Sequence, residues 1–193
     1  MIRLLPVLCF FLVPAGPAGA GEGTPFVGGV FDPPRDAPEL ALDASDGTEL
    51  SLAEYRGKVI VLGFGFTSCP EICPTTLAVL AAARRKLGED AGALQVIYVT
   101  VDPETDTPER MQKYLGGFDS SFIGGTGTEA ELEAVRREYG VLAERKALES
   151  GYSYAHSSYT YLIDGAGRIR ALMPYGHSAD DFVHDIRILI GEQ

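Results

Sequence analysis

The sequence has no cluster of basic residues and no tryptophan. Its 16 lysines and arginines are outnumbered by 27 aspartates and glutamates, which gives a net charge of −11 at pH 7. Nucleic acid is therefore not expected as a partner, because binding to a phosphate backbone depends on clustered cations. There is no internal repeat, and 193 residues, of which 46% are hydrophobic, suffice for one domain with a substantial core.

The sequence also lacks an apolar run long enough to span a membrane. Leu4–Val13 provides about half of the roughly 20 apolar residues that a spanning helix needs. Arg3 precedes this run and the small residues Ala18-Gly19-Ala20 follow it, which is the pattern of a secretory signal peptide. If this segment were not cleaved, it would instead anchor the protein in the inner membrane, facing the periplasm.

These features predict three segments. Residues 1–20 are expected to be a signal peptide and residues 21–38, rich in Gly, Pro and Asp, a flexible leader. Residues 39–193 are expected to form the folded domain. The processed protein is expected to be exported to the periplasm and soluble there.

Cysteine is scarce, and its placement is informative. Cys9 lies in the expected signal peptide, which leaves Cys69 and Cys73, separated by three residues. A disulfide between them would close almost no loop and so would stabilise the fold little. The pair follows an apolar run, Val59–Phe66, and precedes a helix expected to open at Pro74. A helix N-terminus favours the thiolate, which attacks disulfides or binds metals.

The hydrophobic pattern predicts an α/β sandwich with a mixed sheet. Two nearly continuous apolar runs, at 58–66 and 94–101, are expected to be buried central strands. A hairpin is expected at 39–52, before the central strands. Helices are expected at 74–87, 107–115, 128–139 and 178–190, and further strands at 121–123, 158–164 and 168–173.

The cysteine pair differs from a thioredoxin-type redox pair. That motif has two residues between its cysteines, usually a tryptophan before them, and a proline just before the later active-site strand. Here the last position holds His156, directly before the strand expected at 158–164. In this fold that loop lies against the loop before the first helix, so we expect His156 to face Cys69 and Cys73.

Two thiolates and one imidazole form a soft, three-coordinate site. Such ligands select Cu(I) or zinc, and Cu(I) accepts three ligands whereas structural zinc normally requires a fourth. Cu(II) can also be held, with water or a carboxylate completing its coordination. Asp102 is a candidate to orient the bound histidine by accepting its other N–H, although Asp-Pro pairs are also ordinary turn formers.

The remaining histidines and Met173 have simpler interpretations. His177 lies in a polar turn and is expected at the surface, and His184 lies on the last helix. Met173 stands in an apolar strand and is expected to belong to the core.

Four segments, in order, resemble the SCO/SenC family of thioredoxin-fold copper-delivery proteins of cytochrome c oxidase assembly. They are Gly57–Leu77 with Cys69-Pro70-Glu71-Ile72-Cys73-Pro74, Val101–Pro108 with Val101-Asp102-Pro103, Phe122–Gly127, and His156–Asp164. The resemblance implies a thioredoxin-like (peroxiredoxin-like) sandwich with a central mixed β-sheet flanked by helices and an N-terminal hairpin extension. Many relatives have Asp before the histidine, where this chain has Ala155.

The resemblance further implies copper binding by Cys69, Cys73 and His156. The expected function is delivery of copper to, or maturation of, the binuclear copper site of oxidase subunit II, as a metallochaperone rather than an enzyme. A periplasmic copper donor or thiol reductant would be a further partner. The alternative is a periplasmic thiol–disulfide oxidoreductase, which needs the cysteines but not the histidine. A thiol peroxidase is disfavoured, because Phe66 and Pro70 stand where it would need Thr.

Overall fold

The computed structural model describes residues 25–192, so the expected signal peptide lies outside the described residues. These residues contain ten strands: β1 Gly29–Asp36, β2 Leu42–Ala44, β3 Glu49–Leu50, β4 Val59–Gly65, β5 Leu94–Thr100, β6 Ile123–Thr126, β7 Ala143–Leu148, β8 Gly151–His156, β9 Tyr159–Ile163 and β10 Arg168–Pro174. The helices are α1 Ile72–Leu87, α2 Pro108–Gly116, α3 Glu129–Tyr139 and α4 Ala179–Gly191, with 3-10 turns η1 Leu52–Tyr55 and η2 Gly88–Ala93. None of these helices is both long and apolar enough to cross a membrane.

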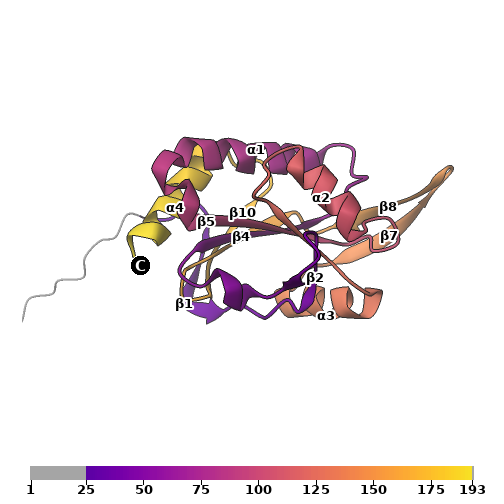
Figure 1. Ribbon diagram of the computed structural model, residues 1–193, viewed down its shortest axis with the longest axis horizontal. Coiled ribbons are helices and arrows are strands. Elements are labelled where there is room, and N and C mark those ends of the chain that lie inside the picture. The colour runs from indigo at the N-terminus through magenta and orange to yellow at the C-terminus, as the bar shows by residue number, and fades with distance from the viewer. Residues whose placement is uncertain (1–24, 193) are drawn as a thin grey trace, which may run out of the picture.

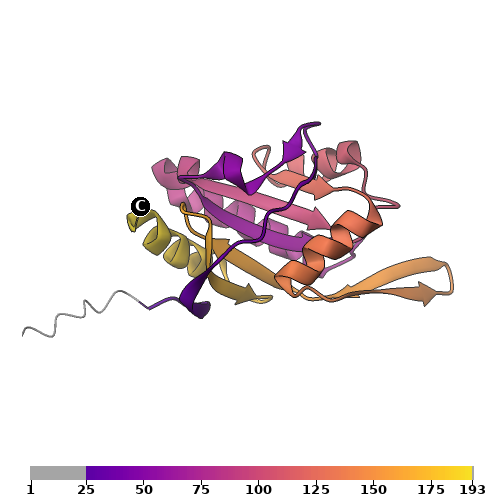
Figure 2. The same ribbon diagram turned by 90° about the horizontal axis from the view of Figure 1, so that it is seen from below.

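Eight strands form one mixed sheet in the order β1-β10-β9-β4-β5-β6-β2-β3. Helices α1, α2 and α4 cover one face of it and α3 covers the other (Figures 1 and 2). The predicted α/β sandwich of thioredoxin-like type, with its central mixed sheet, is therefore confirmed.

The two expected central strands are present, and every residue of both is buried. Strands β4 and β5 pair in parallel, with Val59 opposite Leu94 and Gly65 opposite Thr100. Because parallel strands end at the same edge of a sheet, the loop after β4 lies beside the loop after β5. A hydrogen bond of 2.8 Å from the Val101 N–H to the Gly65 carbonyl joins the two loops.

Helix α1 begins earlier than the sequence predicted. It starts at Ile72 rather than Pro74, and Glu71 provides no side-chain cap. Cys73 therefore lies inside the first helical turn. The predicted C-terminal end is confirmed, since Gly88 follows the helix with a φ of 61°.

Part of the expected flexible leader is a strand. Residues 29–36, within the segment 21–38, form β1, which pairs antiparallel with β10. The pattern concealed this strand because it is mostly exposed and contains Pro33 and Pro34. Proline is tolerated in an edge strand, where it need not donate to a neighbour.

Strands β7 and β8 form a separate two-stranded sheet that projects from the body of the molecule (Figure 2). Ala143 pairs with His156 at the base of this hairpin, and Leu148 pairs with Gly151 at its tip. His156 is thus the last residue of β8, where the hairpin rejoins the domain.

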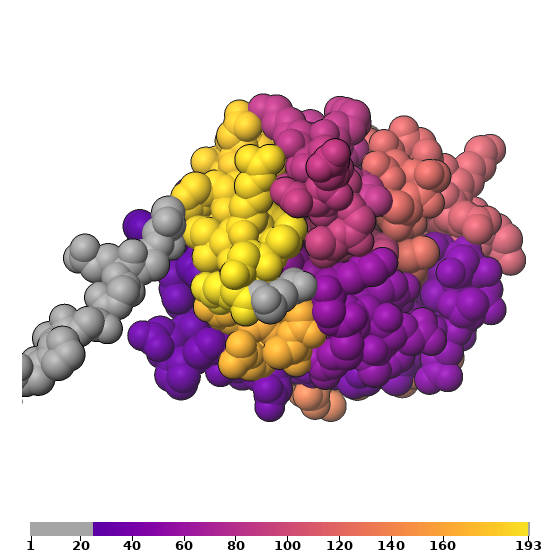
Figure 3. Space-filling model, turned by 60° about the vertical axis from the view of Figure 1, so that its left-hand side comes forward, coloured from indigo at the N-terminus to yellow at the C-terminus, as the bar shows by residue number. Residues whose placement is uncertain are grey.

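A buried carboxylate on α4 holds the first described residues in place. Asp185 is fully buried and accepts hydrogen bonds from the N–H groups of Val27, at 2.8 Å, and Gly28, at 2.9 Å. His184 Nδ1 lies 2.8 Å from the same carboxylate. In Figure 3 helices α4 and α1 lie side by side, with the beginning of the described chain next to α4.

We predict that Asp185→Ala lowers the free energy of unfolding by about 3 kcal/mol, because two backbone donors lose a charged acceptor. Urea unfolding measures this loss, and hydrogen exchange of residues 26–36 should accelerate. The control Asp180→Ala, also on α4, removes an exposed ion pair to Lys86 of α1 and should cost less than about 1 kcal/mol. Equal losses in both variants would contradict the assignment.

Candidate metal centre

The two cysteines lie where the loop after β4 enters α1. Cys73 is buried in the first helical turn, and Cys69 is half-buried in the preceding loop. Both are free thiols in this structure. The N–H of Cys69 donates a hydrogen bond of 3.3 Å to the Phe66 carbonyl, so the loop turns back toward the end of β4.

The two thiols have different acidities. Burial alone would raise the pKa of Cys69, but hydrogen bonds from the backbone of Cys73, Glu71 and Ile72 and from the Cys73 side chain bring it below its ordinary value. Burial raises the pKa of Cys73 to about 12, despite a hydrogen bond from the Tyr98 side chain that lowers it. Cys69 is therefore the thiol that ionises first.

His156 faces the cysteine in α1. Its Nε2 lies 3.8 Å from the Cys73 sulfur, and its Nδ1 lies 2.9 Å from the Ser157 carbonyl oxygen. The carbonyl can only accept, so Nδ1 carries the proton and Nε2 presents a lone pair toward the sulfur. Burial lowers the pKa of His156, although the bond to Ser157 opposes this. The ring is therefore neutral at pH 7.

The structure brings Cys73 and His156 into direct contact and places Cys69 beside Cys73. Across residues 25–192, however, no three His, Cys, Asp or Glu side chains are arranged as a ready-made metal site. Some movement of these side chains would therefore be needed before all three could bind one ion.

Asp102 does not make the contact expected of it. It is buried, with 1% of its surface exposed, and accepts a hydrogen bond of 3.0 Å from the Tyr152 hydroxyl. The histidine ring uses the Ser157 carbonyl instead. Tyr152, which donates to the Asp102 carboxylate, lies on β8 four residues before His156.

Asp102 instead anchors the hairpin that carries His156. Tyr152 also bonds to Thr105, and Arg145 stacks over the Tyr152 ring at 3.7 Å while pairing with Glu104 at 2.9 Å. Next along β8, Tyr154 packs edge-on against Phe66, which packs edge-on against the His156 ring. The hairpin is thus fixed to both loops at the site, near its tip through Tyr152 and near its base through Tyr154 and His156.

Sequence reasoning gave no role to a second carboxylate, Asp106, although Asp106-Thr107-Pro108 is part of the segment that resembles the SCO/SenC family. It is fully buried and accepts hydrogen bonds from Thr67, through its N–H at 3.0 Å and its hydroxyl at 2.5 Å, and from the Thr100 hydroxyl at 2.6 Å. Arg110 reaches Thr67 and Ser68 from α2. Asp106 therefore fixes the loop that carries Cys69. The only sequence signal was its place in the segment 101–108, which has the composition of a turn.

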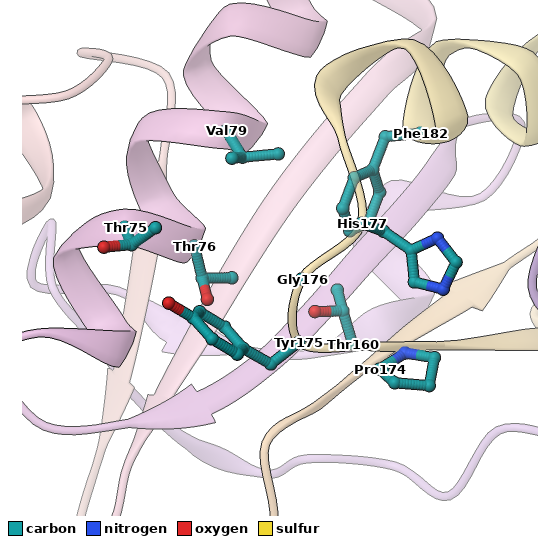
Figure 4. Close-up of a pocket in the computed structure, with 9 residues that line it drawn as sticks. All are labelled: Thr75, Thr76, Val79, Thr160, Pro174, Tyr175, Gly176, His177 and Phe182. Carbon is teal, nitrogen blue, oxygen red and sulfur yellow. The ribbon is translucent and has the colours of Figure 1, made fainter.

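The other candidate side chains lie elsewhere. Met173 is fully buried in β10, and His184 contacts Asp185. His177 lies 3.4 Å from Asp181 and lines a pocket of about 150 Å³ between α1, α4 and the end of β10 (Figure 4). The simpler interpretations of these three residues hold.

The fold and the site together define a thioredoxin-like protein with a dithiol facing an imidazole. The family model described as SCO1/SenC matches residues 32–191. The chain belongs to the SCO1/SenC family.

Relatives and solved structures agree. The chain is 37% identical over 147 residues to Protein SCO1 homolog 1, mitochondrial, of Arabidopsis thaliana. The aligned residues make up 75% of this chain but only 41% of that relative. The fold matches Arabidopsis thaliana ScoI with copper bound at a TM-score of 0.76 and 31% identity, covering 81% of this chain and 99% of that one. The fold also matches apo Sco1 from Thermus thermophilus, at a TM-score of 0.77 and 31% identity. That match covers 88% of this chain and 99% of the Thermus chain.

We predict that iodoacetamide at pH 7 modifies Cys69 more than about 100-fold faster than Cys73, because each pKa unit above the pH lowers the reactive thiolate fraction tenfold. Peptide mass spectrometry over time measures both rates. In the urea-unfolded chain the two rates should become similar. Faster modification of Cys73 in the folded protein would contradict the assigned acidities.

Proposed function

We propose that this protein is a copper metallochaperone of cytochrome c oxidase assembly that binds one copper ion through Cys69, Cys73 and His156. The observation that carries the proposal is the 3.8 Å contact between the Cys73 sulfur and His156 Nε2, with Cys69 beside it. The copper in the related Arabidopsis ScoI structure supports the choice of metal.

The chemistry of the donors also supports copper. Thiolate and neutral imidazole are soft ligands that suit Cu(I), and His156 presents an unprotonated Nε2 because Nδ1 is held by Ser157. Cu(II) would need further ligands such as water or a carboxylate. Three ligands leave a coordination position open, so an incoming ligand from an acceptor can bind the ion before these release it.

The acceptor in this proposal is the binuclear copper site of oxidase subunit II. Residues 1–20 direct export, and the domain works in the periplasm as a soluble protein; an uncleaved N-terminus anchored in the inner membrane is the alternative. A copper donor or thiol reductant in the same compartment would reload or reduce the cysteines. The domain in this proposal begins before residue 39, because it includes the strand β1 at Gly29–Asp36.

We predict that the reduced protein binds one copper per chain, and that Cys69→Ser, Cys73→Ser and His156→Ala each weaken binding more than about 100-fold, since loss of an inner ligand should exceed the effect of an outer contact. Competition with a Cu(I) chelator and metal analysis measure this. His177→Ala is the matched control and should bind normally. Tight stoichiometric copper in His156→Ala would refute the ligand set.

A second function, thiol–disulfide exchange, is favoured by the unequal acidities of the two thiols. A low-pKa Cys69 can attack an acceptor disulfide, and Cys73 can then release the mixed disulfide. Two electrons and two protons pass to the acceptor, and Cys69 and Cys73 become a disulfide.

Mixing the copper-loaded protein with the copper-free soluble domain of subunit II separates the two functions. With a reduced acceptor, we predict transfer of copper to it, measured after the proteins are separated, and no transfer from His156→Ala. With a disulfide-containing acceptor and metal-free protein, thiol exchange alone should appear as new acceptor thiols, and His156→Ala should retain it. An acceptor that gains thiols but never copper would leave only the oxidoreductase.

A further inference from the structure

Two glycines interrupt β4, one of the two fully buried central strands of the sheet. Gly63 and Gly65 lie two residues apart in β4 and so face the same side of the sheet. Glycine weakens a strand interior, and its presence there often marks a close approach by another group. What approaches here is Tyr98 of β5, the residue paired with Gly63.

The two glycines form a slot for the Tyr98 side chain. A methyl group added at Gly63 would lie 2.9 Å from two carbons of the Tyr98 ring. One added at Gly65 would lie 2.1 Å from the Tyr98 hydroxyl oxygen. Neither position can hold a larger residue unless this ring moves. Glycine at both positions therefore leaves the space that the Tyr98 side chain occupies.

The slot directs the tyrosine hydroxyl to the candidate metal centre. The same methyl group at Gly65 would lie 2.7 Å from the Cys73 sulfur, so the Tyr98 hydroxyl and the sulfur border the same point beside Gly65. The Tyr98 hydroxyl lowers the pKa of the Cys73 thiol, and the thiol in turn raises the pKa of Tyr98, which is the pattern expected of a phenol that donates to this sulfur. Tyr98 has 3% of its surface exposed and lines the same small cavity as His156. The Cys73 sulfur therefore contacts both a phenol and an imidazole.

We propose that Tyr98 is a positioning residue for the metal site: its hydroxyl donates a hydrogen bond to the Cys73 sulfur, holds it toward His156, and remains bonded to it when copper is present. This inference rests on the proposed function for its copper-dependent part. A hydrogen bond to a metal-bound thiolate withdraws electron density from the sulfur and tunes the redox potential of the metal. Tyr98 would thereby favour Cu(I) over Cu(II).

The test compares Tyr98→Phe with Tyr114→Phe. The first keeps the ring in its slot and removes only the hydroxyl. The second removes another buried hydroxyl near the cysteines, one for which no hydrogen-bond partner is present among residues 25–192. Both variants should bind one copper. In Tyr98→Phe the thiolate-to-Cu(II) absorption band should move to longer wavelength and the copper reduction potential should fall, while Tyr114→Phe should match the parent protein.

An isotope measurement separates a hydrogen bond from a packing effect. In D₂O the copper–sulfur stretching frequency of the parent protein should shift, because the hydroxyl proton of Tyr98 exchanges for deuterium. The shift should be smaller in Tyr98→Phe, which has no such hydroxyl. A Tyr98→Phe variant with the parent's band, potential and isotope shift would overturn the inference even if copper binds as proposed.

A metal-free measurement keeps the test independent of copper and of any variant. In the reduced protein, NMR should reveal a slowly exchanging Tyr98 hydroxyl proton with cross-peaks to the Cβ protons of Cys73. A parent protein that binds no copper but has these cross-peaks would refute the proposed function and support the hydrogen bond. Absence of the cross-peaks would overturn the inference whether or not copper binds.

Discussion

The contact between the Cys73 sulfur and the His156 ring is the interaction on which the account depends. It joins residues 83 positions apart in the chain, one in the first turn of α1 and the other at the base of the β7–β8 hairpin. Neither residue alone distinguishes a metal site from an ordinary buried thiol or histidine. Their proximity supports a metal site, because the neutral imidazole and the Cys73 sulfur, once it has lost its proton, are both soft ligands.

The rest of the molecule serves to hold the two sides of this contact. On the cysteine side, parallel pairing of β4 and β5 brings two loops to one edge of the sheet, and the buried Asp106 fixes one loop to the other. On the histidine side, the hairpin is secured by Tyr152 on Asp102. Two buried carboxylates thus hold the segments that carry the site, Asp106 through the Thr67 backbone and side chain and Asp102 through the Tyr152 hydroxyl.

The sequence predicted those features whose signal is local. Continuous apolar runs identified β4 and β5, capping patterns identified α3 and α4, and the spacing of Cys69 and Cys73 identified the site. It missed features that depend on partners. Strand β1 is exposed and proline-containing, so only its pairing with β10 reveals it. Asp106 and Tyr98 acquire their roles from neighbours that the fold supplies, and the hydrogen bond of Asp102 to Tyr152 depends on where the β7–β8 hairpin lies.

X-ray absorption spectroscopy of the Cu(I)-loaded protein tests the central claim most directly, since it counts the atoms bound to copper. The account predicts two sulfur ligands and one nitrogen ligand in the parent protein, and two sulfurs without that nitrogen in His156→Ala. A parent spectrum with sulfur ligands alone, or one unchanged by His156→Ala, would contradict it.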